Sequence, residues 1–143
     1  MKKWVFIWAA VCLTALTACH IETSGNGRLD GYWQLRQVDS LGNGVTVDYA
    51  ERDVYWSFQH KLLQLSDLHG TNIICRLTED NQVLTLDTPC LFDRSEGDTP
   101  VSDAAVLQPF GVNALQEQLR IVTLEPDWLV LESSVLRLRF RKY

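Results

Sequence analysis

The sequence predicts an all-β fold, a single antiparallel up-and-down barrel of eight or nine strands with at most one short helix. Short apolar stretches alternate with polar residues at a period of two, the pattern of strands buried on one face. Turn residues separate these stretches at hairpin spacing, and no long helical segment that could connect parallel strands lies between them. The chain has 143 residues, 46% of them hydrophobic, which suits one domain with its own core. A two-sheet sandwich is the alternative that the same pattern allows.

The first 18 residues have the pattern of a secretory signal peptide. Lys2 and Lys3 give a basic start, and an uncharged apolar run follows from residue 4 to residue 16. About a dozen apolar residues are too few to span a bilayer, since a transmembrane helix needs about 18 or more. We therefore expect residues 1–18 to be removed from the mature protein, together with Cys12.

The end of this segment, Leu16-Thr17-Ala18-Cys19, resembles the lipobox of bacterial lipoproteins. The resemblance implies that cleavage precedes Cys19, that Cys19 carries the lipid anchor and that residues 19–28 form a polar tether. It also implies a cell-envelope location. His20 stands where an aspartate for inner-membrane retention would be, which favours the outer membrane facing the periplasm, with the cell surface as the alternative. An ordinary signal peptide followed by an accidental cysteine is the competing interpretation.

The predicted mature chain is acidic, because it keeps 11 of the 13 basic residues and all 18 acidic ones. This charge argues against nucleic acid as a partner, since phosphate backbones repel it. The expected partners are the membrane, through the lipid anchor, and either a small apolar ligand or an envelope protein.

The predicted domain, residues 29–143, opens with three short strands in which apolar residues occupy every second position. These residues are Trp33 and Leu35, then Val54, Trp56 and Phe58, then Leu63 and Leu65. A hairpin follows, in which Asp80-Asn81 forms a two-residue turn and places Leu77 opposite Leu84 and Cys75 opposite Leu86. The apolar side chains of both strands then share one face of the sheet.

Cys75 and Cys90 form a candidate disulfide, because they are the two cysteines left to the folded domain and the expected compartment is oxidising. In the predicted hairpin, Cys90 lies about 13 Å along the strand from the position beside Cys75, beyond bridging distance. A turn of the chain at Pro89 would bring the two together. The alternative is that Cys75 is a small core residue and Cys90 lies in a loop.

The next part of the chain is expected to contain a loop, one short helix and two strands. Residues 93–103 have the composition of a loop, and residues 113–119 fit one or two helical turns capped by Asn113. Residues 119–124 fit a strand with a bulge after Ile121, and residues 128–131 fit the strand that follows a turn.

The last strand shows the clearest alternation. Leu136, Leu138 and Phe140 point one way, and Arg137, Arg139 and Arg141 point the other. We expect the outward arginines to discourage edge-to-edge pairing, with contact to an anionic ligand as the alternative.

The triplet Gly31-Tyr32-Trp33, at the start of the first strand, is similar to the Gly-x-Trp signature of the lipocalins. The predicted mature chain also resembles the small lipocalin-like lipoproteins of Bacteroidota, which share the lipobox, the Gly-x-Trp start and a closing Leu-x-Phe-Arg-Lys, here residues 138–142. In lipocalins a tryptophan of this kind closes one barrel end under an arginine from near the end of the chain. The resemblance thus implies a structural plug made of Gly31, Trp33 and one of Arg139 or Arg141. The lipocalin Thr-Asp-Tyr motif is not found in the expected later loop, so the resemblance concerns the fold more than the ligand.

No group of residues has the spacing of a metal site or of a catalytic centre. The candidate ligands are His60, His69 and Asp67 for zinc, and Asp93, Glu96 and Asp98 for calcium. Neither set has the ligand pattern that these ions require. The motifs of serine hydrolases, zinc proteases and phosphate-binding loops do not occur either. We therefore expect no metal, no cofactor and no enzymatic activity.

The sequence favours a binding protein anchored in the cell envelope, whose barrel holds a small apolar ligand. The residues expected to line the interior are Leu63, Leu65, Ile73, Leu77, Leu84, Leu86, Leu136, Leu138 and Phe140. The alternative is a protein-interaction module, such as an envelope assembly factor or a periplasmic enzyme inhibitor, because the same leucines would also fill an eight-stranded barrel.

Overall fold

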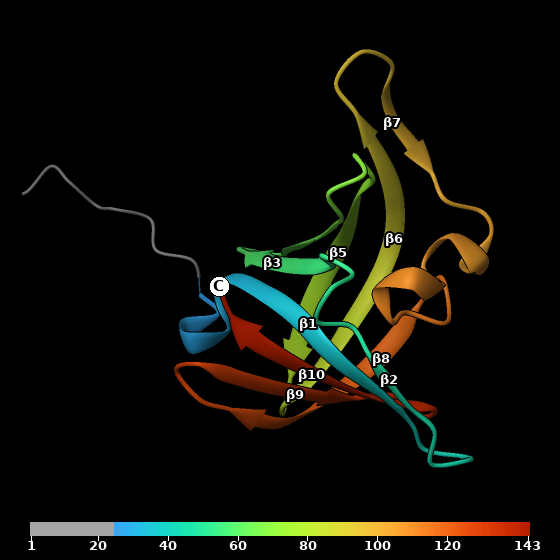
Figure 1. Cartoon of the computed structure of the whole chain (residues 1–143). Coiled ribbons are helices and arrows are strands. Elements are labelled where there is room, and N and C mark those ends of the chain that lie inside the picture. The colour runs from blue at the N-terminus through green and yellow to red at the C-terminus, as the bar shows by residue number, and fades with distance from the viewer. Residues whose placement is uncertain (1–24) are drawn as a thin grey trace, which may run out of the picture.

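The computed structural model describes residues 25–143, so the predicted signal peptide and Cys19 lie outside the described residues. The described chain forms one antiparallel sheet that curls into a closed barrel (Figure 1). Eight strands make the barrel in the order β1, β3, β4, β5, β6, β8, β9 and β10, and pairing of β10 with β1 closes it. The all-β, lipocalin-like barrel predicted from the alternating pattern is therefore confirmed.

The barrel strands are β1 (Gly31–Ser40), β3 (Tyr55–Gln59), β4 (Leu62–Ser66), β5 (Asn72–Asp80), β6 (Val83–Asp93), β8 (Glu117–Leu124), β9 (Trp128–Glu132) and β10 (Leu136–Lys142). Two short strands are added to the sheet: β2 (Thr46–Asp48) pairs with the end of β1, and β7 (Gly97–Pro100) pairs with the end of β6. Figure 1 shows the β6–β7 hairpin rising beyond the barrel. The loop expected over residues 93–103 is thus partly strand, because the backbone groups of the long β6 find partners in β7.

The short helix expected at residues 113–119 is wrong. Residues from Glu117 onward belong to β8, and the helical turns of the described chain are three 3₁₀ turns, η1 (Gly27–Leu29), η2 (Ala104–Val106) and η3 (Gln108–Phe110). The Glu117 carboxylate accepts hydrogen bonds from the backbone N–H groups of Asn113, at 2.5 Å, and Ala114, at 3.3 Å. Asn113 therefore does not cap a helix, and the acid holds the turn that leads into the strand.

The hairpin between β5 and β6 turns one residue later than the predicted Asp80-Asn81 turn. Its central residues are Asn81 and Gln82, with φ of 50° and 64°, so Leu77 pairs with Leu86 and not with Leu84. Since side chains alternate at a period of two, this shift of the partner by two residues keeps the same face inward. The predicted face is confirmed, and the predicted register is wrong.

Three bulges interrupt the strand pairing. The bulge predicted after Ile121 is present, because the β8–β9 register shifts between Ile121 and Thr123. A second lies on β1 at Arg36, between the pairs made by Leu35 and Gln37. In the third, Cys75 of β5 faces two residues of β6, since Ile74 pairs with Cys90 and Arg76 with Asp87.

The core lies inside the barrel and consists of large apolar side chains from every barrel strand. The residues predicted to face inward belong to this cluster, with Leu136 at its margin. The largest fully buried side chains are Trp33, Trp56, Phe58 and Phe140. The barrel interior is therefore occupied by the protein's own side chains.

Candidate functional site

One end of the barrel, here called the closed end, is plugged by Trp33. Its side chain is fully buried, and its indole N–H donates to the carbonyl of Leu29 in η1 at 2.8 Å. The ammonium group of Lys142 lies 4.4 Å from the centre of the Trp33 ring and donates to the carbonyl of Asp30. Gly31 has a φ of 112°, and a Cβ there would lie 2.9 Å from the Lys142 Nζ. The positive φ favours glycine, whereas the Lys142 ammonium could move away from a side chain at this position. The structure thus places Gly31 and Trp33, the residues predicted for the plug, together at this end of the barrel.

The cation over the plug is Lys142, and the expectation that Arg139 or Arg141 would fill this place is wrong. The register explains the difference: Trp33 pairs with Lys142, which shares the inward direction of Phe140 two residues before it. The two arginines alternate with these residues and lie on the outer face. An ammonium over an indole gives the same kind of cation–π contact that a guanidinium would give.

The opposite end, here called the mouth, is covered by residues 101–112, the mouth segment. Figure 1 shows its turns in orange, between β7 and β8 and on the other side of the molecule from the blue turn before β1. Leu107, Phe110 and Val112 are each 2% exposed or less and join the core. The indole N–H of Trp56 donates to the carbonyl of Phe110 at 3.0 Å. Gly111, at a φ of 87°, packs so closely on Leu138 that a Cβ would lie 2.9 Å from that side chain. Because this segment has no apolar period, its role was not predicted from the sequence.

The interior predicted as a ligand site is thus filled between these two ends. The Trp56 ring centre lies 5.0 Å from that of Phe140 and 6.1 Å from that of Phe58, which are ordinary distances for packed aromatic rings. The inward leucines belong to the same buried cluster as these rings.

Cys75 and Cys90 are free thiols in the structure, and their disulfide stays a prediction. The bulge brings Cys90 opposite Ile74, the neighbour of Cys75 along β5, so the two lie much nearer along the ladder than the predicted register allowed. Burial, with smaller effects of Cys90 and Asp87, raises the pKa of the Cys75 thiol to about 12. Cys75 is therefore protonated at neutral pH and is a poor nucleophile.

Two of the acids that could have been metal ligands, Asp67 and Asp93, accept hydrogen bonds within their own loops. The Asp67 carboxylate accepts from the backbone N–H groups of His69 and Thr71, both at 2.9 Å, and closes the β4–β5 loop. The Asp93 carboxylate does the same for Ser95 at the β6–β7 turn, and these hydrogen bonds lower the pKa of Asp93. Within residues 25–143 no three His, Cys, Asp or Glu side chains are grouped so that they could hold a metal ion.

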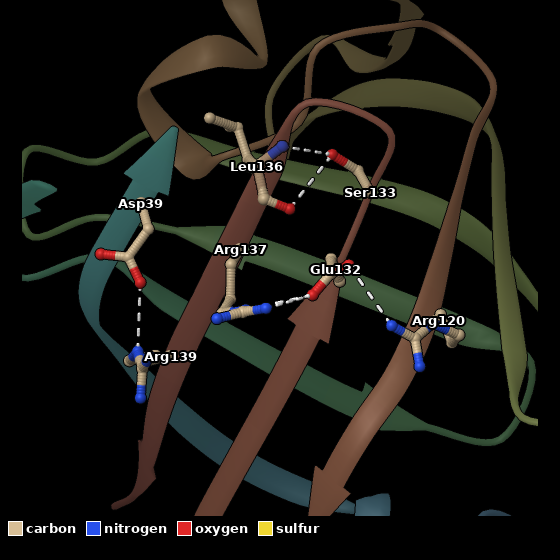
Figure 2. Close-up of polar contacts among 7 residues, drawn as sticks. All are labelled: Asp39, Arg120, Glu132, Ser133, Leu136, Arg137 and Arg139. Atoms are coloured by element: carbon tan, nitrogen blue, oxygen red, sulfur yellow. Dashed lines mark hydrogen bonds and ion pairs between the residues drawn. The ribbon is translucent and has the colours of Figure 1, made fainter. Parts of the chain in front are cut away.

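The outward arginines of β10 form ion pairs across the outer face of the sheet (Figure 2). Arg139 reaches Asp39 of β1 at 3.2 Å, and Arg137 reaches Glu132 of β9 at 2.9 Å. Arg120 of β8 binds the other oxygen of Glu132 at 3.3 Å. Since β10 pairs with a strand on each side, these arginines do not protect an edge, and that interpretation of them is wrong.

The Asp39 carboxylate accepts hydrogen bonds from three different side chains on this face. It accepts hydrogen bonds from Gln37 at 2.7 Å and from Thr46 at 2.9 Å, besides that from Arg139. Burial alone would raise the pKa of Asp39, but these three hydrogen bonds outweigh it and hold the pKa below its ordinary value. Asp39 is thus ionised at neutral pH and fixes the position of the Arg139 side chain.

A closed antiparallel barrel with a buried tryptophan plug beside a short 3₁₀ turn is the fold of the lipocalin-like class. Proteins of this class are typically binding proteins. The chain belongs to the family described as the lipocalin-like domain, whose model matches residues 13–143. The family membership and the fold confirm the resemblance to lipocalin-like proteins that Gly31 and Trp33 indicated.

Two solved structures share this fold. A lipocalin-like protein from Bacteroides uniformis is 24% identical, covers 82% of this chain and 100% of its own, and superimposes with a TM-score of 0.61. An uncharacterized protein from Bacteroides eggerthii is 17% identical, covers 80% of this chain and 99% of its own, and has a TM-score of 0.54. No curated protein matches the sequence. At these identities the likeness shows the fold alone.

Proposed function

We propose that this protein is a lipid-anchored cell-envelope protein that binds another protein through the outside of a filled barrel. The filled interior carries the proposal: Trp33 closes one end, Phe110 covers the other, and Trp56 and Phe140 occupy the space between them. A barrel without internal space presents its loops and outer face to partners. This supports the interaction module over the carrier that the leucine-rich strands also allowed.

The anchor in this proposal is Cys19, with residues 19–28 as the tether, and the proposed location is the outer membrane facing the periplasm. The support is the resemblance of Leu16-Thr17-Ala18-Cys19 to a lipobox. Among residues 25–143, no helix has the length and apolar character needed to cross a membrane. A lipid on Cys19 would hold the domain at the surface of the bilayer.

Labelling with palmitate in a host that processes lipoproteins tests the anchor. The full chain should take up the label and fractionate with membranes, and Cys19→Ser should do neither. Cys12→Ser is the matched control, because Cys12 lies inside the predicted signal peptide and its loss should leave labelling unchanged. Label that persists in Cys19→Ser would refute the assignment.

Cross-linking in intact cells tests the partner. The full chain should form a discrete cross-linked species with one envelope protein, which purifies with it in a fixed ratio. The proposal is contradicted if purified protein carries a small molecule in the barrel, seen as added mass in native mass spectrometry that disappears after extraction with organic solvent.

A carrier of small apolar ligands is the second candidate, and the mouth segment is the observation that favours it. The backbone–backbone hydrogen bonds of residues 103–112 join residues of that range to one another, and the bond from the Trp56 indole to the Phe110 carbonyl links the range to the barrel. The side chains of Phe110 and Leu107 are held by packing. Their displacement would open space beside Trp56. Thermal melting with fatty acids, sterols, retinoids and haem tests this function, since a ligand bound only to the folded state raises the melting temperature. The carrier is favoured if an added ligand raises the melting temperature of Phe110→Ala by more than it raises that of the parent protein.

A further inference from the structure

We propose that a hollow on the outer face of β1, β2, β9 and β10 binds a sugar unit of a glycan. This outer hollow has a volume of about 440 Å³ and is lined by Arg36, Arg139 and Trp128, with Gln37, Thr46 and Asp48 at its sides. Its size lies within the range of small-molecule sites. The proposal goes beyond the proposed function, since it requires neither the lipid anchor nor a protein partner.

Trp128 provides the apolar surface of the outer hollow. It begins β9, pairs with Arg141 of β10 and is 46% exposed, although a tryptophan usually buries more of its large surface. Phe140, the residue before its partner Arg141, is by contrast fully buried in the core. A pyranose ring has a face of C–H groups, which would cover the exposed indole and remove apolar surface of both from water.

The bulge on β1 places two polar side chains, Arg36 and Gln37, in the lining of the outer hollow. Because Arg36 is the extra residue of this bulge, Arg36 and Gln37 both lie on the outer face, where a regular strand would turn one of them inward. Arg36 donates through Nη1 to Gln34 at 3.2 Å, and Arg139 donates through Nε to Asp39. Within residues 25–143 these are the hydrogen bonds that the two guanidinium groups make. Each guanidinium has five N–H donors, so most of them are available to a ligand.

The charge of the outer hollow distinguishes a sugar from a simple ion. Arg36 and Arg139 are balanced by Asp48, in the lining, and by Asp39, which holds Arg139. Arg141 lies beside Trp128, and Arg137 with Glu132 forms an ion pair further along β10 and β9. Two cations and two anions cancel in net charge, so this group of four residues favours neither a free anion nor a free cation strongly. A ring with several hydroxyl groups, which both donate and accept, matches this mixture of guanidinium, carboxylate, amide and hydroxyl groups.

Binding of defined oligosaccharides to the full chain tests the proposal. The protein is kept in nanodiscs, which contain no sugar-based detergent, and is titrated with malto-, xylo-, chito-, manno- and galacturono-oligosaccharides by calorimetry and tryptophan fluorescence. We expect at least one of them to bind with a Kd below about 1 mM. Trp128→Ala and Arg139→Gln should each weaken it at least tenfold, and Arg139→Lys should weaken it less than Arg139→Gln.

Arg120→Gln is the matched control, because Arg120 also lies on the outer face in an ion pair but does not line the outer hollow. The affinity of Arg120→Gln for the oligosaccharide should stay within twofold of that of the parent protein. The melting temperature of every variant is measured to confirm that it is folded. The proposal is overturned if none of the oligosaccharides binds, if folded Trp128→Ala binds as well as the parent, or if acetate binds as tightly as the galacturono-oligosaccharides. The last result would indicate a plain anion site.

Discussion

The two ends of the barrel are closed by different means, although each uses a tryptophan whose indole N–H donates to a backbone carbonyl. At the closed end, Trp33 reaches Leu29, four residues away, and Lys142 of the last strand lies over its ring. At the mouth, Trp56 reaches Phe110, 54 residues away, in a segment without strand pairing. Opening the closed end would therefore break strand pairing, whereas the mouth segment can detach from the barrel while the strands stay paired. Segments held in this way open at lower free energy than the fold as a whole.

Removal of the plug should have the largest effect. Trp33→Ala is expected to lower the free energy of unfolding by about 3 to 5 kcal/mol, because it empties a fully buried site inside the ladder. Trp33→Phe keeps a ring but leaves the Leu29 carbonyl without its donor, which costs about 1 to 3 kcal/mol. Urea denaturation measures both, and a loss below about 1 kcal/mol in Trp33→Ala would show that Trp33 is not a structural plug.

Truncation at the mouth should cost less. Phe110→Ala is expected to lower the free energy of unfolding by about 2 to 3 kcal/mol, below the usual range for a buried Phe, because the mouth segment can detach locally. Hydrogen exchange should accelerate for amides of residues 104–112 and stay unchanged in β1 and β10. Equal loss of protection in the strands and in the mouth segment would show that the two ends are not independent.

The cation over the plug should contribute a smaller amount. Lys142→Met keeps most of the chain length and removes the charge, and we expect a loss of about 1 kcal/mol from the cation–π contact. Lys142→Arg should recover most of it, since a guanidinium can also lie over an indole. If Lys142→Met and Lys142→Arg unfold at the same urea concentration as the parent, the contact contributes nothing to the closed end.

The smallest effect should be a pH-dependent one on the outer face. Because the pKa of folded Asp39 is below its ordinary value of 3.8, its ionisation adds stability above that value, and the addition is lost as the pH falls through the folded pKa. Asp39→Asn should therefore be less stable than the parent at pH 7 by under about 1 kcal/mol, given solvent screening. The difference should shrink on acidification. A difference that grows towards low pH would contradict this sign.

The strands and their inward faces could be predicted because a half-buried strand must place apolar residues at every second position. Lys142 could have been predicted in the same way, since it has the parity of Leu138 and Phe140. The resemblance to lipocalins instead implied an arginine over the tryptophan, and both Arg139 and Arg141 have the opposite parity. The hairpin at Asn81 shows the limit of the pattern, because two registers that differ by two residues bury the same face.

The remaining features depend on contacts that a sequence pattern does not contain. Phe110 and Leu107 are buried by strands far away in the chain, and no local period marks them. The bulge at Arg36 lies in the pairing of β1 with the distant β10, so the outer hollow beside it was not predicted. Where Cys19 lies, and whether Cys75 and Cys90 are joined, stay predictions.

The pairing of the first strand with the last determines when the barrel can close. Gly31–Ser40 opens the barrel, but its partner Leu136–Lys142 is the last strand of the same barrel, about a hundred residues further along the chain. Until that strand has been synthesised, β1 and β9 each present an unpaired edge, and Trp33 has no Lys142 above it. The contacts that close the barrel are thus among the most distant in the sequence, and contacts of this kind slow folding because a long loop must be ordered before they form.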